Sequence, residues 1–337
     1  MGFLKLVGIE NFKMWKRISV RIMLLLMVVL AILLCGLSKY VENKDNPKHT
    51  AVTDVANWRE ETQQEVTAYT AVVQAAEKSK NTIDKMSLDS NKINLAEAKY
   101  RLAHNIPPKT GLTSVWGWMI KMEDSGSVSG YPMSIAVITL FSLIFVAASV
   151  AGEFTEGTMK MMIARPYSRA QILTAKLAST ILYALTLLGV FAVVQFIGMG
   201  ILFGFGDLGA KELFWTGSSV VNIPAVVKLL AVYGLDMLTM LFYVIFGLFL
   251  STLFRSRSLV TGAALFMLLI GSGICMTLAI FFDWVRYIAF GISTFAQYVL
   301  RGSLIPGATL GFALAVCGIY TAVFLAGGYF SFLKRDI

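Results

Sequence analysis

Six long apolar segments limit the fold of this chain more strongly than any other feature. They lie at about residues 20–37, 133–151, 173–200, 225–250, 259–281 and 308–332. A helix needs roughly 17 to 25 apolar residues to cross a hydrocarbon core of about 30 Å, and each segment is long enough. Hydrophobic residues make up 57% of the 337 residues, which is too apolar for a soluble domain. We therefore predict an all-α polytopic membrane protein with six transmembrane helices.

The distribution of positive charge predicts the orientation. With the N-terminus inside, the inner segments carry thirteen Lys and Arg residues against four Asp and Glu residues, whereas segment 38–132 carries twelve of each sign. Cytoplasmic loops of membrane proteins are enriched in Lys and Arg. The net charge of +9 is therefore a topology signal rather than a nucleic-acid-binding surface. We expect a multi-pass protein of the bacterial cell membrane, in contact with lipid, with both termini cytoplasmic.

The apolar segments divide the chain into three regions. Residues 1–37 hold a basic amphipathic segment, expected to form an interfacial helix, and transmembrane helix 1. Residues 38–132 are expected to form an extracellular helical insertion between helices 1 and 2. Residues 133–337 hold helices 2–6, with a cytoplasmic loop at 152–172 and an outer segment at 282–307. That outer segment is too apolar for a solvated loop, so it is either a re-entrant helix pair or a plain interfacial helix.

Residues 38–132 have helical periodicity. Apolar residues recur at spacings of three, four and seven, which is typical of amphipathic helices: Val55, Trp58, Thr62, Val66, Tyr69, Val73, Ala76, Met86, Ile93 and Tyr100. A break near Asn81 predicts two helices folded into a hairpin, closed by Pro107-Pro108. The hairpin is either a self-packed cap or a module that recognises a substrate or partner. His49 and His104 are too isolated to indicate a metal site.

Two polar residues lie inside apolar segments. Asp236 falls in the fourth segment and Gln195 at a comparable depth in the third. Burying a charge in hydrocarbon costs several kcal/mol, so such residues usually have a function or a hydrogen-bonding partner. The two residues therefore indicate either an intramembrane path or an interhelical hydrogen bond that fixes packing.

Small and aromatic residues predict packing and interface positions. Gly307, Gly311 and Ala315 recur every four residues and are expected to let helix backbones approach closely. Trp116 and Trp118 are expected to anchor the outer membrane interface. All three cysteines lie in apolar segments, where we interpret them as packing residues without a disulfide or metal site: Cys35, Cys275 and Cys317.

The loop between the second and third apolar segments is charged and interrupted by Gly and Pro. It reads Glu153-Phe154-Thr155-Glu156-Gly157-Thr158, then Arg165-Pro166-Tyr167-Ser168-Arg169, and runs on to Lys176. Gly157 permits a sharp turn, Pro166 redirects the chain, and Lys176 is expected to anchor the third helix at the inner headgroups. The sequence contains no phosphate-binding G-x-x-x-x-G-K-[ST] motif. We therefore expect a transport subunit that is not itself an enzyme.

This loop resembles that of the type-2 permease subunits of bacterial ATP-binding-cassette exporters. The turn Leu253-Phe254-Arg255-Ser256 and the closing Phe332–Ile337 add to the resemblance, which covers residues 1–37 and 133–337. It implies that the loop contains a coupling helix that seats in a cytoplasmic ATPase, two copies of which bind ATP and magnesium. It also implies pairing with a second permease copy or a paralogue. The coupling residues implied are Glu153, Glu156, Gly157, Thr158, Arg165, Pro166, Ser168, Arg169 and Lys176.

The expected function is ATP-driven export of an amphipathic peptide, a lipid-like antibiotic or drug, or sodium. One alternative is a secondary transporter or channel that needs no ATPase, which would show more intramembrane charge and an internal repeat. Another is a membrane sensor or scaffold whose extracellular hairpin binds a ligand. The loop charges have two interpretations as well, since they either contact an ATPase or only satisfy one another.

Overall fold

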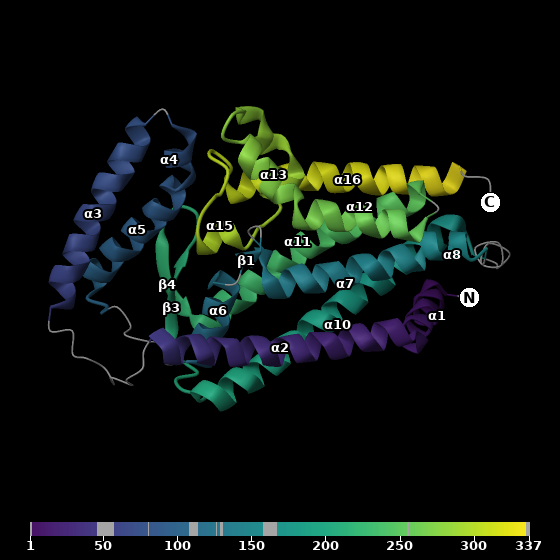
Figure 1. The fold of residues 1–337 in the computed structure, drawn as a ribbon, viewed down its shortest axis with the longest axis horizontal. Coiled ribbons are helices and arrows are strands. Elements are labelled where there is room, and N and C mark those ends of the chain that lie inside the picture. Colours follow the sequence, from purple (N-terminus) through teal and green to yellow (C-terminus); the bar gives the residue numbers. More distant parts are fainter. Residues whose placement is uncertain are drawn as a thin grey trace.

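The fold is mostly helical. The computed structural model describes residues 2–45, 57–79, 81–107, 114–125, 127–128, 131–157, 167–254 and 256–334. Within these residues, five helical stretches are long and apolar enough to cross a membrane. They are α2 (Ile18–Asp45), α7 (Met133–Ser149) with α8 (Ala151–Thr155), α10 (Arg169–Phe203), α11 (Ala225–Leu253) and α16 (Leu310–Lys334). These helices form an elongated bundle (Figure 1).

The fifth predicted segment is bent. It consists of α12 (Arg257–Leu269) and α13 (Gly271–Leu278), whose axes differ by 44° across Ile270. The expected number of six spans is therefore reached when this bent pair is counted as one span. After Leu278 the chain continues in short turns rather than in a long helix.

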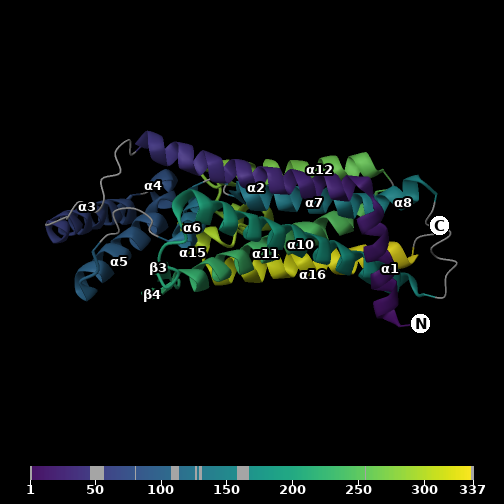
Figure 2. The ribbon, with the colours of Figure 1, turned by 90° about the horizontal axis from the view of Figure 1, so that it is seen from below.

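Helix α1 (Phe3–Lys16) crosses the end of the bundle (Figure 2). Its buried residues Leu6, Glu10 and Met14 are four apart and therefore share one face. That face packs on α10, with Leu6 against Ile172 and Ala175. Figures 1 and 2 place α1, α8 and the last turn of α16 at the same end of the bundle.

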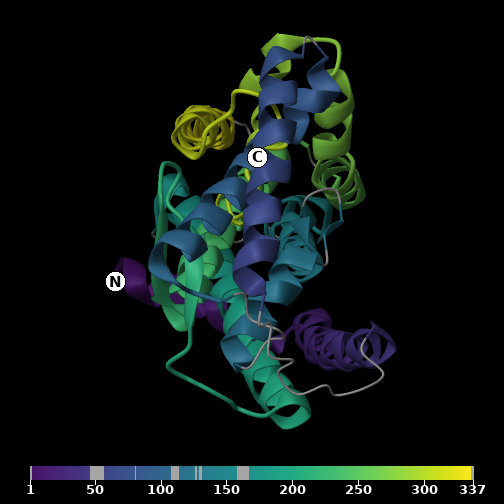
Figure 3. The ribbon, with the colours of Figure 1, turned by 90° about the vertical axis from the view of Figure 1, so that its left-hand side faces the viewer.

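The opposite end carries a helical hairpin of α3 (Trp58–Lys78), α4 (Thr82–Met86) and α5 (Leu88–His104), which faces the viewer in Figure 3. Arg59 donates to Asn105 at one end, and Lys92 pairs with Glu77 at 2.8 Å at the other, so α3 and α5 are antiparallel. The buried side chains Thr62, Val73, Ala76 and Ile93 belong to the predicted apolar series. The helical hairpin is confirmed, whereas its extracellular location stays a prediction. His49 and Val55 lie outside the described residues.

Two short β-hairpins depart from the all-α prediction. Strands β1 (Ser127–Val128) and β2 (Tyr131–Pro132) pair before α7, and β3 (Lys211–Trp215) pairs antiparallel with β4 (Val220–Pro224). The β3–β4 turn contains Gly217 at φ 95°, and its flank is rich in β-branched residues, which favour strands. This pair lies beside α5 (Figure 1).

Helix α6 (Val115–Ser125) packs among the long helices rather than with the hairpin. It contacts α10 and α11, so the predicted insertion of residues 38–132 divides between the hairpin and the bundle. Trp118 stacks on Phe203 with ring centroids 3.9 Å apart, and Trp116 stacks on Phe196 at 4.8 Å. Trp118 is buried, so its predicted role as an interface anchor was wrong.

The segment after α13, which we predicted to lie outside, folds into three short pieces instead of a helix pair. They are the 3₁₀-helix η1 (Asp283–Tyr287), α14 (Ala289–Ile292) and α15 (Gln297–Leu300). Phe290 packs on Phe242 and Phe246 of α11, and the hydroxyl of Thr239 donates to the carbonyl of Ser293 at 2.8 Å. The part of the segment from Ala289 onward is therefore buried against the bundle, whereas η1 is mostly exposed.

The small-residue series does not pack within the chain. Gly307 precedes α16 at φ 77°, while Gly311 and Ala315 are exposed, and a Cβ added at Gly311 would meet no neighbour. Close approach of α16 to α11 occurs instead at Gly327, where a Cβ would lie 2.9 Å from Phe249. The last helix turns its other face to α11, because Ala313, Cys317 and Phe332 form its buried series.

Candidate functional site

Four charged side chains meet where α1, α8 and α10 converge. Lys176 of α10 lies 3.1 Å from a carboxylate oxygen of Glu10 in α1 and 2.7 Å from one of Glu153 in α8. Lys13 lies 3.2 Å from the second oxygen of Glu10. We refer to Glu10, Lys13, Glu153 and Lys176 as the charge cluster. Through Lys176 it ties three separate segments of sequence together.

Burial makes these ion pairs strong constraints. The Lys176 side chain is 0% exposed, and those of Glu10 and Glu153 are each 7% exposed. Desolvation raises the pKa of Glu10, but the charges of Lys176 and Lys13 outweigh it, so the pKa is lowered from its usual value. Glu10 is therefore a carboxylate at neutral pH. Removing one member of such a buried cluster leaves an uncompensated charge.

The position of Lys176 differs from the expectation drawn from the sequence. We expected this residue at the inner headgroups, yet its ammonium group is buried between two carboxylates. The buried pair of Glu153 with Lys176 was not predicted from the sequence. The sequence held one clue, because Glu10 lies on the same helical face as Leu6 and Met14. An acid on an apolar face requires a buried cation.

Other predicted loop residues have local structural roles. The hydroxyl of Ser168 accepts from the backbone N–H of Gln171 at 3.2 Å, and the Gln171 side chain accepts from the Ser168 N–H, which forms a capping box for α10. Arg169 donates to the carbonyl of Leu333 in α16 at 3.2 Å. Gly157 has φ 69°, as its predicted sharp turn requires.

Some of the remaining loop residues are exposed, and others lie outside the described residues. Glu156 and Gly157 are exposed to solvent. They follow Glu153 of the charge cluster by three and four residues. Thr158, Arg165 and Pro166 lie outside the described residues. Their predicted roles at an ATPase surface stay predictions.

A second polar group surrounds the two predicted intramembrane residues. Asp236 of α11 and Gln195 of α10 are both buried, and Gln195 donates through Nε2 to the sulfur of Met122 in α6 at 2.5 Å. Asp236 interacts electrostatically with Glu123, the neighbour of Met122. Glu123 in turn interacts with Tyr233 of α11. We call Glu123, Gln195, Tyr233 and Asp236 the carboxyl cluster, in which Gln195 is included because it contacts Met122, the residue before Glu123.

Glu123 was not anticipated from the sequence. We assigned it to the polar outer domain, but its side chain is completely buried because α6 packs on α10 and α11. The Ser134 hydroxyl donates to both of its oxygens, at 3.1 and 2.9 Å. Burial raises the pKa of Glu123 to about 7. The apolar neighbours Trp118, Met119 and Ile120 were the signal that this stretch would be buried.

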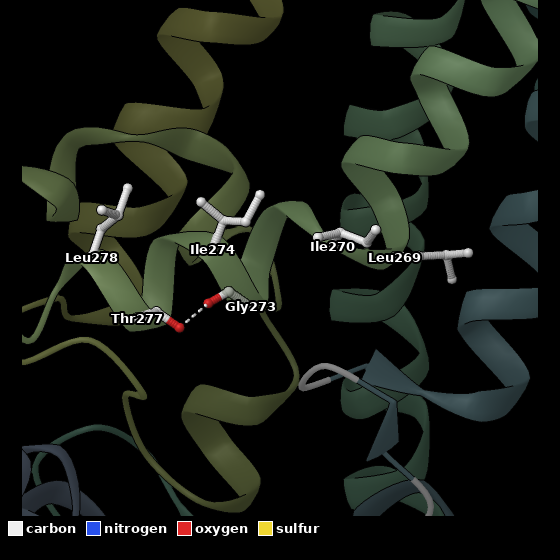
Figure 4. A pocket seen from close by; sticks show the side chains of 6 residues that line it. All are labelled: Leu269, Ile270, Gly273, Ile274, Thr277 and Leu278. Atoms are coloured by element: carbon white, nitrogen blue, oxygen red, sulfur yellow. Dashed lines mark hydrogen bonds between the residues drawn. The ribbon is translucent and has the colours of Figure 1, made fainter.

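A surface groove at the bend of α12 and α13 has a different character. Figure 4 shows its lining side chains, which enclose about 530 Å³: Leu269, Ile270, Gly273, Ile274, Thr277 and Leu278. The Thr277 hydroxyl already donates to the Gly273 carbonyl at 2.9 Å. The groove therefore offers an apolar surface and no polar group that selects a ligand.

Comparison with known proteins places the chain in a family. A family model described as "Protein of unknown function (DUF2705)" matches residues 115–337. The "Uncharacterized protein YhcI" of Bacillus subtilis is 32% identical over 289 residues, covering 84% of this chain and 85% of that protein. The "Uncharacterized membrane protein YdbK" of the same organism is 26% identical over 215 residues, covering 63% of this chain and 82% of that protein.

The family model begins at the first residue of α6. It includes Glu123 and Asp236 of the carboxyl cluster and all the long apolar helices after α2. The relative named as a membrane protein agrees with the five long apolar helices and the bent pair found here. The chain is thus a multi-pass membrane protein and belongs to the DUF2705 family.

Proposed function

We propose that this chain is the permease subunit of an ATP-driven exporter and that a separate cytoplasmic ATPase supplies the energy. The observation that carries the proposal is the charge cluster, in which buried Lys176 joins α1, α8 and α10. A loop that receives force from a partner must be connected rigidly to the helices that move. The buried ion pairs give the loop after α8 such a connection.

The mechanism follows from this arrangement. ATP and magnesium bind in the partner, two copies of which contact the exposed surface around Glu156 and the loop that follows it. Closure of the ATPases displaces α8, and the charge cluster transmits that displacement to α1 and α10. Two permease subunits, identical or paralogous, then rock between inward and outward access.

Placement in the bacterial cell membrane completes the proposal. α1 lies along the cytoplasmic interface, both termini are cytoplasmic, and the α3–α5 hairpin is an extracellular insertion between the first two spans. The basic residues of α1 suit anionic headgroups. The cargo proposed is an amphipathic peptide, a lipid-like antibiotic or drug, or sodium, because the exposed apolar faces of the bundle suit a lateral path from lipid.

Purification with and without a partner tests the proposal. The chain alone should hydrolyse no ATP, and affinity purification from its native membrane should recover an ATPase with nucleotide-binding motifs. The loss of one exposed ion pair costs about 1 kcal/mol or less. In the reconstituted complex, Glu156→Lys should reduce ATPase stimulation by more than this free energy accounts for. ATP hydrolysis by the isolated chain would overturn the proposal.

A charge reversal separates an ATPase contact from a local pair. Combining Glu156→Lys with Arg165→Glu keeps the attraction if these two residues only pair with each other. It should fail to restore stimulation if the ATPase carries the complementary charges. Wild-type stimulation in the double variant would confine both residues to a structural role.

One observation favours a second candidate function, an ion-driven secondary transporter. Such proteins keep ionisable residues among their membrane helices, and the carboxyl cluster supplies Glu123 beside Asp236. Substrate uptake or release by proteoliposomes that contain only this chain, driven by an ion gradient without ATP, would support this function. Transport that requires the ATPase would support the exporter instead.

A further inference from the structure

The carboxyl cluster holds two buried acids without a cation. Asp236 is 2% exposed, Glu123 is 0% exposed, and they interact with each other across α11 and α6. Among the described residues, neither carboxyl has a Lys or Arg side chain as an electrostatic partner. The charge cluster at the other end of the bundle, by contrast, neutralises its carboxylates with lysines.

Three oxygen atoms of this cluster also lack a hydrogen-bond donor. They are Oδ2 of Asp236, Oε1 of Gln195 and the hydroxyl of Tyr233, each on a side chain that is at least nine-tenths buried. Tyr233 lies one turn before Asp236 on α11 and interacts with both carboxyls, so its hydroxyl belongs to the same polar site. Buried polar atoms are normally satisfied, so three orphaned oxygens together indicate a missing partner, either a donor or a cation.

The two hydrogen-bond donors found at this cluster already have acceptors. The Ser134 hydroxyl donates to Glu123, and the Gln195 amide nitrogen donates to Met122, which leaves the amide oxygen of Gln195 as its free end. The further titratable group that faces the cluster is the thiol of Cys35 in α2, which interacts with Tyr233. A thiol is a weak donor and supplies no positive charge.

Electrostatics limits the charge that the site can hold. Two ionised carboxylates close together in an apolar environment repel each other and lose their hydration, so one of them keeps a proton. The remaining single negative charge is balanced by one positive charge. Carboxylate, amide and phenol oxygens are hard ligands of the kind that hard cations prefer.

We propose that the carboxyl cluster is a binding site for one small monovalent cation of the sodium or potassium type, held by oxygen atoms. Sites for divalent ions generally supply more charged ligands, and no group of three His, Cys, Asp or Glu side chains is close enough together in the described part of the chain. The inference does not rest on the exporter function, because binding is a property of this chain alone.

Thermal unfolding of the purified full chain in detergent tests the site. A ligand that binds only the folded state raises the unfolding temperature with the logarithm of its concentration. Sodium or potassium chloride should therefore raise it, while choline chloride at equal ionic strength should not. Separate titrations with sodium and potassium identify which ion is preferred.

Variants locate the effect. Asp236→Asn and Glu123→Gln should each weaken the apparent cation affinity by about tenfold or more, since each replaces one of the two carboxyl groups that share the single negative charge of the site. Glu97→Gln, the same kind of change on the outer hairpin, should retain the wild-type response. Tyr233→Phe keeps both carboxyls and should weaken the response less, which provides a variant for the case that the acid substitutions do not fold.

Protons should compete with the cation. The response should be smaller at lower pH, because protonation of the carboxyls removes the negative charge that the cation needs. Equal responses to choline and to sodium or potassium, a response to magnesium or calcium alone, or no response in the wild type would each overturn the proposal. Retention of the full response in Asp236→Asn would overturn it as well.

Discussion

At the scale of single residues, Lys176 is the residue whose loss should be most costly. Lys176→Met leaves Glu10 and Glu153 buried without their shared cation, and breaking a buried ion pair in this way costs about 3–5 kcal/mol. Chemical unfolding in detergent should detect this loss. Adding Glu10→Gln and Glu153→Gln removes the orphaned charges, so the triple variant should recover most of the stability. Equal instability of the single and triple variants would contradict this account.

Glu123 should make stability depend on pH. Its pKa of about 7 in the folded state lies above the usual value of 4.5, so the folded chain binds more protons between these two values. Stability should therefore fall as the pH rises from about 4.5 to about 7, by on the order of 3 kcal/mol. Glu123→Gln should flatten this dependence in a buffer free of sodium and potassium.

The matched control is Glu60→Gln, which changes an exposed residue of α3. It should leave the slope of stability against pH as in the wild type. An unchanged slope in Glu123→Gln would show that another group is responsible.

Residue roles were harder to predict than residue positions because pairing depends on the tertiary fold. Asp236 and Gln195 were recognised from the sequence, since polar residues stand out in apolar segments. Glu123 was not, because it belongs to a stretch whose charges are balanced and whose burial depends on α6 packing on α10 and α11. Lys176 was recognised, but its partner Glu10 is 166 residues away in the chain.

At the scale of elements, the long helices were predictable and the short ones were not. Apolar length fixed the approximate bounds of α2, α7, α10, α11 and α16, and heptad and three-four spacing fixed the hairpin. The bend at Ile270 and the three short pieces after α13 have no strong local pattern, because tertiary contacts with α11 stabilise them. The strands β3 and β4 are only five residues each, which is too short for a clear periodic signal.

One contact between the α3–α5 hairpin and the bundle is formed at a glycine. Gly302 follows α15 at φ 85°, and a Cβ there would lie 2.8 Å from the Cβ of Asp89 and 3.0 Å from its backbone carbon. Gly302→Ala should therefore displace α5 from the bundle, in addition to the roughly 1–2 kcal/mol cost of left-handed backbone for an L-residue. Limited proteolysis should cleave the hairpin faster in this variant.

Gly311→Ala is the matched control, since an added Cβ on that face of α16 meets no neighbour. Its proteolysis should match that of the wild type. Equal cleavage rates in the Gly302 and Gly311 variants would show that the hairpin is held by other contacts.

At the scale of the whole molecule, the two clusters lie toward opposite ends of the bundle and differ in charge balance. The charge cluster neutralises its carboxylates with lysines from the same chain, which suits a permanent structural link. The carboxyl cluster lacks such partners among the described residues and keeps three oxygens unsatisfied, which suits an exchangeable ligand. The net charge of +9 does not reveal this difference between the clusters, because the difference arises when the fold brings distant segments together.

The orientation of the bundle is open to a direct test. The excess of thirteen cations over four acids on the predicted inner segments predicts that α1, α8 and the start of α10 face the cytoplasm, because Lys and Arg near the ends of spans are retained there. The α3–α5 hairpin lies at the other end of the molecule and should then be outside. In a variant without native cysteines, Ser79→Cys should react with a membrane-impermeant maleimide in intact cells. Ser168→Cys is exposed but should react only after the membrane is permeabilised. Labelling of Ser168→Cys in intact cells would reverse the orientation and remove the cytoplasmic surface that an ATPase requires.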